Sequence, residues 1–136
     1  MRFACLAILL LAGCSQGADP GDAWIGNYRG PNRDALCVAR EGQGFKAGLI
    51  TYGDGDMNCS LSGPAQIRGD GLVITPRGDS ECSVQVSITN GIATFGQRTS
   101  ACAYYCGPGA NFAGRKLPKA PDASTKVSDF AGVPLC

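Results

Sequence analysis

Apolar and polar residues alternate most regularly along residues 82–89. The apolar positions are Cys82, Val84, Val86 and Ile88, and the polar positions are Ser83, Gln85, Ser87 and Thr89. A period of two is expected for a strand that buries one face. Asn90 and Gly91 follow, the strongest two-residue signal for a type I′ hairpin turn, before the chain returns through residues 92–95. The pattern therefore predicts an antiparallel hairpin over residues 82–95.

A related arrangement occurs twice earlier in the chain. An Asp stands three residues before a Cys at Asp34 and Cys37, at Asp56 and Cys59, and at Asp79 and Cys82. Successive pairs are offset by 22 and 23 residues. In each unit an Asp-led turn leads into a strand, and a second turn leads into a returning strand. The earlier units are predicted to have a turn at 41–44 before a strand at 45–52, and a turn at 69–71 between strands at 65–68 and 72–75.

The aromatic stretch from Trp24 to Arg29 predicts an opening strand, with Trp24, Gly26 and Tyr28 on one face. The 136-residue chain contains 20 Gly and 8 Pro, which favour tight turns over long helices. Short strands joined by turns protect their edges when the sheet curls on itself. We therefore expect an all-β protein, a small, mostly antiparallel barrel or curled meander of seven to eight strands, braced by disulfides.

Two segments depart from the strand pattern. Cys102 and Cys106 are four residues apart, which places them on one face of a short helical turn, and the Gly-Pro-Gly sequence at 107–109 ends that turn. Residues 115–136 contain prolines and lysines without a period of two. They are predicted to form an irregular strap that Cys136 clamps to the β domain.

The first fourteen residues combine Arg2, an apolar run at residues 3–11 and the ending Ala-Gly-Cys at 12–14. The run is shorter than the ~20 residues that span a bilayer, and small residues mark a cleavage site. This ending resembles the lipobox of bacterial lipoproteins. The resemblance implies cleavage before Cys14, a diacylglyceryl group on its thiol and an acyl group on the new amine, with no other cofactor. By the sorting rule of enteric bacteria, Ser15 instead of Asp after the lipidated cysteine implies that the protein is anchored in the outer membrane and faces the periplasm.

These features divide the chain into four parts. We expect a lipoprotein signal peptide at 1–13, a lipidated tether at 14–22, a β domain at 23–114 and the strap at 115–136. Two or more acyl chains hold a protein stably on a membrane. The extended tether reaches about 30 Å at ~3.3 Å per residue. The β domain is therefore expected to lie close to a membrane of the bacterial cell envelope.

The charges nearly cancel, since the chain has 12 Lys plus Arg and 11 Asp plus Glu. Loss of Arg2 with the signal peptide leaves 11 of each. No net field attracts the mature chain to nucleic acid, so nucleic acid is not an expected partner.

Of the eight cysteines, Cys5 leaves with the signal peptide and Cys14 carries lipid. The six that remain are Cys37, Cys59, Cys82, Cys102, Cys106 and Cys136. In an oxidising compartment an even number predicts disulfides, here three. Zinc or iron–sulfur ligation is the alternative, which the absence of His and of any C-x2-C pair disfavours.

The repeat also limits the pairing of these cysteines. If Cys37, Cys59 and Cys82 lie on equivalent strands of a meander, neighbouring members are two strands apart, about 9–10 Å. A disulfide requires Cα atoms nearer than ~7 Å. We predict that each of the three pairs with one of the other cysteines, Cys102, Cys106 or Cys136, which leaves six connectivities open.

Other chemistry is sparsely represented. Asp54, Asp56 and Asn58 resemble the start of a calcium loop, but Cys59 and Ala65 stand where that loop needs Gly and a bidentate Glu, so no metal is expected. The absence of His leaves no Ser-His or Cys-His pair. A periplasmic enzyme could still use a carboxylate pair in a predicted turn, either Asp54 with Asp56 or Asp79 with Glu81.

A non-enzymatic binding or structural module is the interpretation that we favour. The last two thirds of the chain resemble uncharacterised cysteine-rich bacterial envelope proteins, a resemblance that implies no activity. The candidate surface for an envelope protein or glycan is Tyr104, Tyr105, Gly107, Pro108 and Gly109, because aromatic side chains on a rigid loop lose little entropy on binding.

An inhibitor of a cell-wall hydrolase is the second alternative. Lipidated β-barrels that inhibit lysozyme have this size and location, and their Ser-Gly-x-x-Tyr motif is matched by Ser62 and Gly63. Gln66 stands in place of the Tyr, so no inhibitory residue is assigned.

Overall fold

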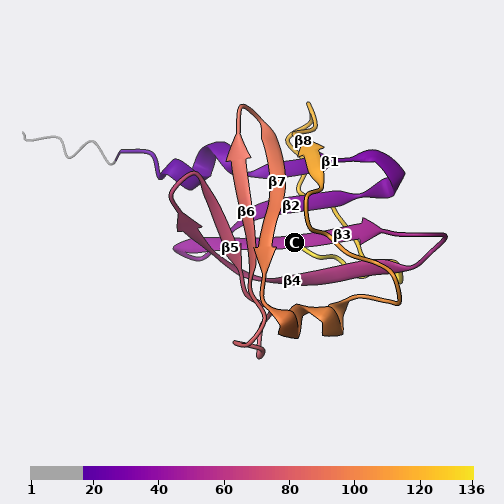
Figure 1. Ribbon diagram of the computed structural model, residues 1–136. Helices are drawn as coiled ribbons and strands as arrows, with labels where there is room; N and C mark the ends of the chain where they lie inside the picture. The colour runs from indigo at the N-terminus through magenta and orange to yellow at the C-terminus, as the bar shows by residue number, and fades with distance from the viewer. Residues whose placement is uncertain (1–16) are drawn as a thin grey trace, which may run out of the picture.

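The computed structural model describes residues 17–136, so the predicted signal peptide, Cys14 and Ser15 lie outside the described residues. Eight strands form one sheet in which each pairs antiparallel with the next along the chain (Figure 1). The strands are β1 (Gly26–Arg29), β2 (Ala35–Glu41), β3 (Gly44–Tyr52), β4 (Asn58–Arg68), β5 (Gly71–Ile74), β6 (Val84–Thr89), β7 (Ile92–Arg98) and β8 (Lys116–Pro118). A bridge between Tyr28 and Lys119 joins the first strand to the end of the last. The predicted fold class is confirmed as a nearly closed, eight-stranded antiparallel barrel.

The predicted turns lie between the strands as expected. Asn90 and Gly91 have φ angles of 51° and 73°, the positive values that a type I′ turn requires. Strand ends differ from the predictions by a few residues, because β6 begins at Val84 and β4 extends back to Asn58. The strand pattern therefore predicted the meander but not its boundaries.

The barrel interior is filled by side chains that alternate with outward-facing ones, as on β4 and β6. The largest fully buried side chains include Tyr28, Leu36, Leu49, Leu72, Ile74, Phe95 and Phe112. Phe95 and Phe112 meet edge to face, with ring centroids 6.5 Å apart. The phenol of Tyr28 donates a hydrogen bond to the carbonyl of Trp24, and burial raises its pKa to about 12.

Antiparallel connections alternate between the two ends of the barrel. The N-terminal end carries η1 (Pro20–Trp24) and the turns at 42–43, 69–70 and 90–91. The opposite end carries the four other connections, at 30–34, 53–57, 75–83 and 99–115. We call it the bridged end, because the disulfides Cys59–Cys106 and Cys82–Cys102 lie there. The chain enters β1 at the N-terminal end, so the bridged end lies on the opposite side of the barrel.

The start of the β domain differs from the prediction. Trp24 ends a 3-10 helix instead of opening a strand, and β1 begins at Gly26. Gly21, within the tether predicted at 14–22, is buried against the barrel. Pro20 favours the first helical turn, and the Asp19 side chain accepts a hydrogen bond from the Gly21 amide.

The C-terminal strap predicted at 115–136 is partly regular. Residues 116–118 form β8, and the chain then runs beside β1, where the Asn27 amide donates to the Ser124 carbonyl and the Arg29 guanidinium to the Lys126 carbonyl. Val127 and Leu135 are buried on the outer face of the sheet in a second cluster with Ala35, Cys37, Ile50 and Tyr52. Cys136 is bonded to Cys37, as the predicted clamp requires. Within residues 17–136, no helix has the length and apolar character needed to cross a bilayer.

Candidate binding surface on the bridged end

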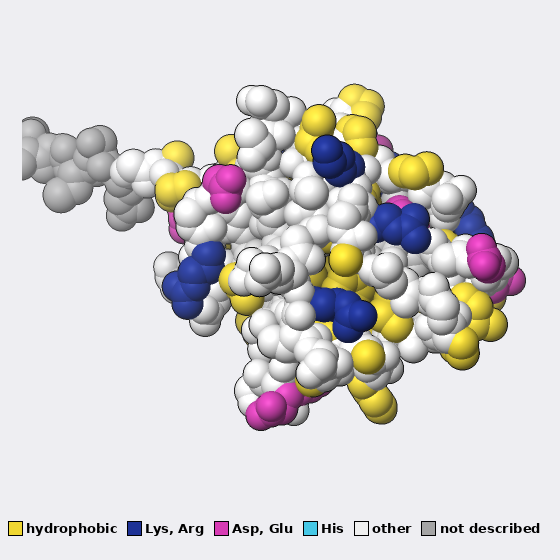
Figure 2. All heavy atoms as spheres, viewed as in Figure 1, with side chains coloured by type: hydrophobic (Ala, Val, Ile, Leu, Met, Phe, Trp, Pro, Cys, Tyr) yellow, Lys and Arg dark blue, Asp and Glu magenta, His cyan; other side chains and the backbone are white. Residues whose placement is uncertain are grey.

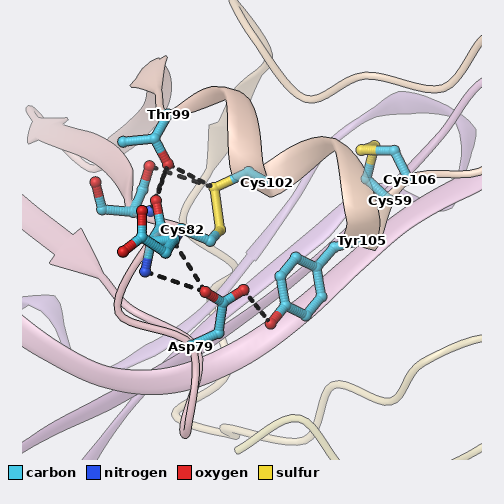
Figure 3. Close-up of a disulfide and its surroundings, with 9 residues drawn as sticks. Cys59, Asp79, Cys82, Thr99, Cys102, Tyr105 and Cys106 are labelled. Carbon is cyan, nitrogen blue, oxygen red and sulfur yellow. Dashed lines mark hydrogen bonds between the residues drawn. A yellow bond between two sulfur atoms is a disulfide. The ribbon is translucent and has the colours of Figure 1, made fainter.

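The predicted helical turn is present as η3 (Ser100–Tyr105), a 3-10 helix at the bridged end. Cys102 is bonded to Cys82, and Cys106, directly after η3, is bonded to Cys59 (Figure 3). The Cα atoms of these pairs are 4.7 and 4.0 Å apart. Together with the bridge from Cys37 to Cys136, they confirm that Cys37, Cys59 and Cys82 each pair with one of the three later cysteines.

Hydrogen bonds hold one end of η3 at the loop before β6 and the other end at β4. The Thr99 hydroxyl donates to the Glu81 carbonyl at 2.6 Å and accepts from the Ser83 amide at 3.1 Å. At the other end the Gly107 amide donates to the Asn58 carbonyl at 2.8 Å. η3 is thus fixed beside the part of β4 that extends beyond its pairing with β5.

Tyr105 has a structural role within this arrangement. Its hydroxyl donates to Asp79 Oδ2 at 2.9 Å, while Asp79 Oδ1 accepts from the amides of Glu81 and Cys82 (Figure 3). Removal from water, followed by the hydrogen bond to the Asp79 carboxylate and its negative charge, raises the pKa of the Tyr105 phenol. Asp79 therefore connects η3 to the loop that precedes β6.

Tyr104 is placed differently, because 87% of its surface is exposed. Its ring meets the Tyr105 ring edge to face, with centroids 5.3 Å apart. Met57, in the β3–β4 connection, is 46% exposed and lies beside Gly107, and Pro108 is also exposed. We call Met57, Tyr104 and Pro108 the Tyr104 surface. Of the five residues predicted for the binding surface, Tyr104, Pro108 and Gly109 are exposed, whereas Tyr105 and Gly107 are half-buried. Met57 is exposed beside them, and no sequence pattern indicated it.

The carboxylates that the sequence left open for catalysis do not form a buried pair. Asp54 and Glu81 are exposed, and Asp56 pairs with Arg33 at 2.9 Å. Within the described part of the chain, Asp34 is the one buried carboxylate. Its two oxygens accept from Arg115 Nη1 at 3.1 Å and from the Tyr52 amide at 2.7 Å. Asp34 therefore joins β2, β3 and the start of the strap.

The described residues contain no group of three or more His, Cys, Asp or Glu side chains placed to hold a metal ion. Asn58, from the calcium-like sequence, donates instead to the Asp56 carbonyl within its own turn. These side chains shape the β3–β4 connection.

Two surface grooves are lined by residues other than those of the Tyr104 surface. One, of about 590 Å³, crosses β5, β6 and β7 and is lined by Arg68, Asp70, Gln85 and Gln97 among others. The second, of about 510 Å³, lies between β4 and the β5–β6 loop and includes Gln66 and Arg77. Ser62 and Gly63, the partial inhibitor motif, lie on β4, where Gly63 is buried against the carbonyl of Thr75.

Comparison with known proteins adds no assignment to this geometry. No protein family, curated protein sequence or solved structure matches the chain.

Proposed function

We propose that this protein is a lipid-anchored lipoprotein of the bacterial cell envelope that binds a partner, a protein or a glycan, through the Tyr104 surface. The observation that carries the proposal is the 87% exposure of Tyr104 on a turn held by two disulfides. An exposed aromatic ring contributes little to folding. On a rigid turn, however, it can be buried by a partner with little loss of entropy.

The distribution of exposed hydrophobic side chains supports the bridged end as the binding side. Five large ones are exposed in the described part of the chain, namely Met57, Ile92, Tyr104, Phe130 and Val133. Met57 and Tyr104 belong to connections of the bridged end, whereas Ile92 begins β7 at the N-terminal end. After running along β1, the strap packs through Val127 against Ala35 and Tyr52 at the bridged end. Phe130 and Val133 follow Val127 in the strap. Hydrophobic side chains reach the surface beside the β3–β4 turn and below η3 in the orientation of Figure 2.

Three disulfides support a location in an oxidising compartment. The lipobox-like sequence ending at Cys14 supports a lipid anchor there. The non-enzymatic part of the proposal is supported by the absence of His from the sequence and by the pairing of the buried Asp34 with Arg115.

Capture from detergent-solubilised envelope tests the binding function. The parent protein is compared with Tyr104→Ala, which removes the exposed ring, and with Tyr105→Phe, which keeps the ring beside it but loses the Asp79 hydrogen bond. We expect one discrete partner to be captured by the parent and by Tyr105→Phe, and to be reduced at least tenfold with Tyr104→Ala. Equal capture by all three proteins would show that the Tyr104 surface is not the binding site.

A further inference from the structure

The segment before β1 is packed onto the N-terminal end of the barrel. A Cβ atom on Gly21 would lie 2.5 Å from Phe45 Cζ and 2.8 Å from Ile67 Cδ1, so only Gly fits this closely. Trp24 and Ile25 pack against the same interior cluster. Residues 21–25 thus close this end of the barrel.

Polar contacts hold the segment in addition to this packing. Arg40 pairs with Asp19, with Nη1 3.6 Å from Oδ2, and also with Asp22, while its guanidinium covers the Phe45 ring at 4.3 Å. Lys119 Nζ donates to the Ala23 carbonyl at 2.7 Å, and the Tyr28 hydroxyl donates to the Trp24 carbonyl at 2.9 Å. The barrel therefore holds the chain from Asp19 onward.

This packing shortens the connection to the proposed anchor. From Cys14 to Asp19 the chain has five Cα steps, which span at most about 17 Å. Twelve steps separate Cys14 from Gly26, so without the packed segment the reach would be about 40 Å. The reach of about 17 Å from Cys14 to Asp19 is smaller than the length of β4, which at eleven residues is about 37 Å.

We infer that the N-terminal end of the barrel rests against the lipid headgroups of the anchoring membrane, so that the bridged end and its Tyr104 surface point away from the bilayer. The inference rests on the lipid anchor of the proposed function. A connection of about 17 Å is too short for the barrel to turn over and place the bridged end on the same membrane.

The charges around this end indicate which lipid surface it fits. Three cations of this end, Arg40, Arg68 and Lys119, stand beside four anions, Asp19, Asp22, Glu41 and Asp70. The fourth cation is Arg77, which extends from the 75–83 connection and pairs with Glu41 at 3.0 Å. Because these charges balance, the contact requires no anionic lipid. Orientation on neutral phosphatidylcholine should therefore match that on vesicles with anionic lipid.

Energy transfer from tryptophan to a dansyl group on lipid headgroups tests the orientation, because Trp24 is the sole tryptophan of the chain. In the lipidated protein Trp24→Phe is combined either with Gln43→Trp, on the exposed β2–β3 turn, or with Tyr104→Trp. In phosphatidylcholine vesicles we expect at least threefold more efficient transfer from position 43 than from position 104. Equal efficiencies, or more efficient transfer from position 104, would overturn the inference.

A second pair of variants tests the role of the packed segment. Gly21→Leu with Arg40→Gln is added to both reporters to release residues 19–25, and correct folding is checked by the mass of the three-disulfide form. Release is expected to bring the two efficiencies within a factor of 1.5, whereas an unchanged ratio would contradict the role of the segment. If the anchor itself is absent, the parent protein neither carries lipid by mass nor sediments with vesicles, an outcome distinct from either result.

Discussion

Two irregular segments of this protein are both fixed to strands by disulfides, but in different ways. η3 is held by two bridges at Cys102 and Cys106, and Cys102 is its one buried residue. The strap is held by one bridge at its last residue, together with the buried side chains of Val127 and Leu135 and hydrogen bonds along β1. η3 therefore depends mainly on cross-links and hydrogen bonds, whereas the strap also depends on the burial of large apolar side chains.

This difference separates a binding element from a structural one. A segment that is held by packing must turn its large side chains toward the protein, as Leu135 does over Gly48, where an added Cβ would lie 2.5 Å from Leu135 Cβ. A segment that is held by cross-links can keep its shape with its largest side chain outside, as Tyr104 does. The pair of disulfides around η3 thus makes an exposed aromatic ring compatible with a fixed backbone.

Removal of the strap bridge is expected to have the largest effect. Cys37→Ala with Cys136→Ala opens a closed loop with a sequence separation of 99 residues. Loop-closure entropy predicts a loss of about 4.7 kcal/mol in the free energy of unfolding. Urea denaturation measures the loss, and hydrogen exchange should show faster exchange at residues 127–135 with η3 unchanged. Loss of protection at η3 as well would show that the two segments are not independent.

Removal of the first bridge of η3 comes next. Cys82→Ala with Cys102→Ala opens a loop with a separation of 20 residues, for which the same relation predicts about 3.3 kcal/mol. Exchange should increase at residues 99–105, and residues 127–135 should stay protected. The opposite pattern would contradict the contrast between the two segments.

Truncation of a packed side chain in the strap should cost nearly as much as a bridge. Leu135 is 5% exposed, so Leu135→Ala is expected to lower the free energy of unfolding by about 3 kcal/mol in urea denaturation. A loss below about 1 kcal/mol would mean that the disulfide alone holds the strap.

Much of this contrast, though not its detail, could be predicted from the sequence. Local signals predicted the meander, namely the alternation at residues 82–89, the Asn90–Gly91 turn and the spacing of the cysteines. The spacing also predicted correctly that Cys37, Cys59 and Cys82 each pair with one of the three later cysteines. The pairing of Asp34 with Arg115 joins residues 81 positions apart, and β8 forms because β7 offers it a partner edge. Neither leaves a local pattern. Met57 likewise joins the Tyr104 surface only through the fold.

A third irregular segment, η1 at the N-terminal end, is held by a hydrogen bond whose contribution to stability depends on pH. Tyr28→Phe removes the hydrogen bond to the Trp24 carbonyl and should cost about 1 kcal/mol at pH 8. An unfolded tyrosine ionises near pH 10, whereas the folded Tyr28 has a pKa of about 12. The folded state therefore binds more protons between these values, and the parent loses stability as the pH rises through this window.

The variant lacks this loss, so the difference between the two proteins should narrow from pH 8 to pH 11 in urea denaturation. A difference that is constant over this range would show that Tyr28 ionises equally in both states.

The smallest effect on stability is expected at Tyr104. Tyr104→Ala removes a side chain that is 87% exposed, so the free energy of unfolding should change by less than about 0.5 kcal/mol. Thermal and urea denaturation of the oxidised protein measure the change. A loss above about 1 kcal/mol would assign the ring a role in folding instead of binding.

Photo-crosslinking in intact cells tests the central claim most directly. A benzophenone amino acid replaces either Tyr104, on the bridged end, or Gln43, on the N-terminal end. The proposed function predicts one discrete crosslinked product from position 104 and none of that mass from position 43. The same product from both positions, or from position 43 alone, would contradict the assignment of the Tyr104 surface as the site where this protein meets its partner.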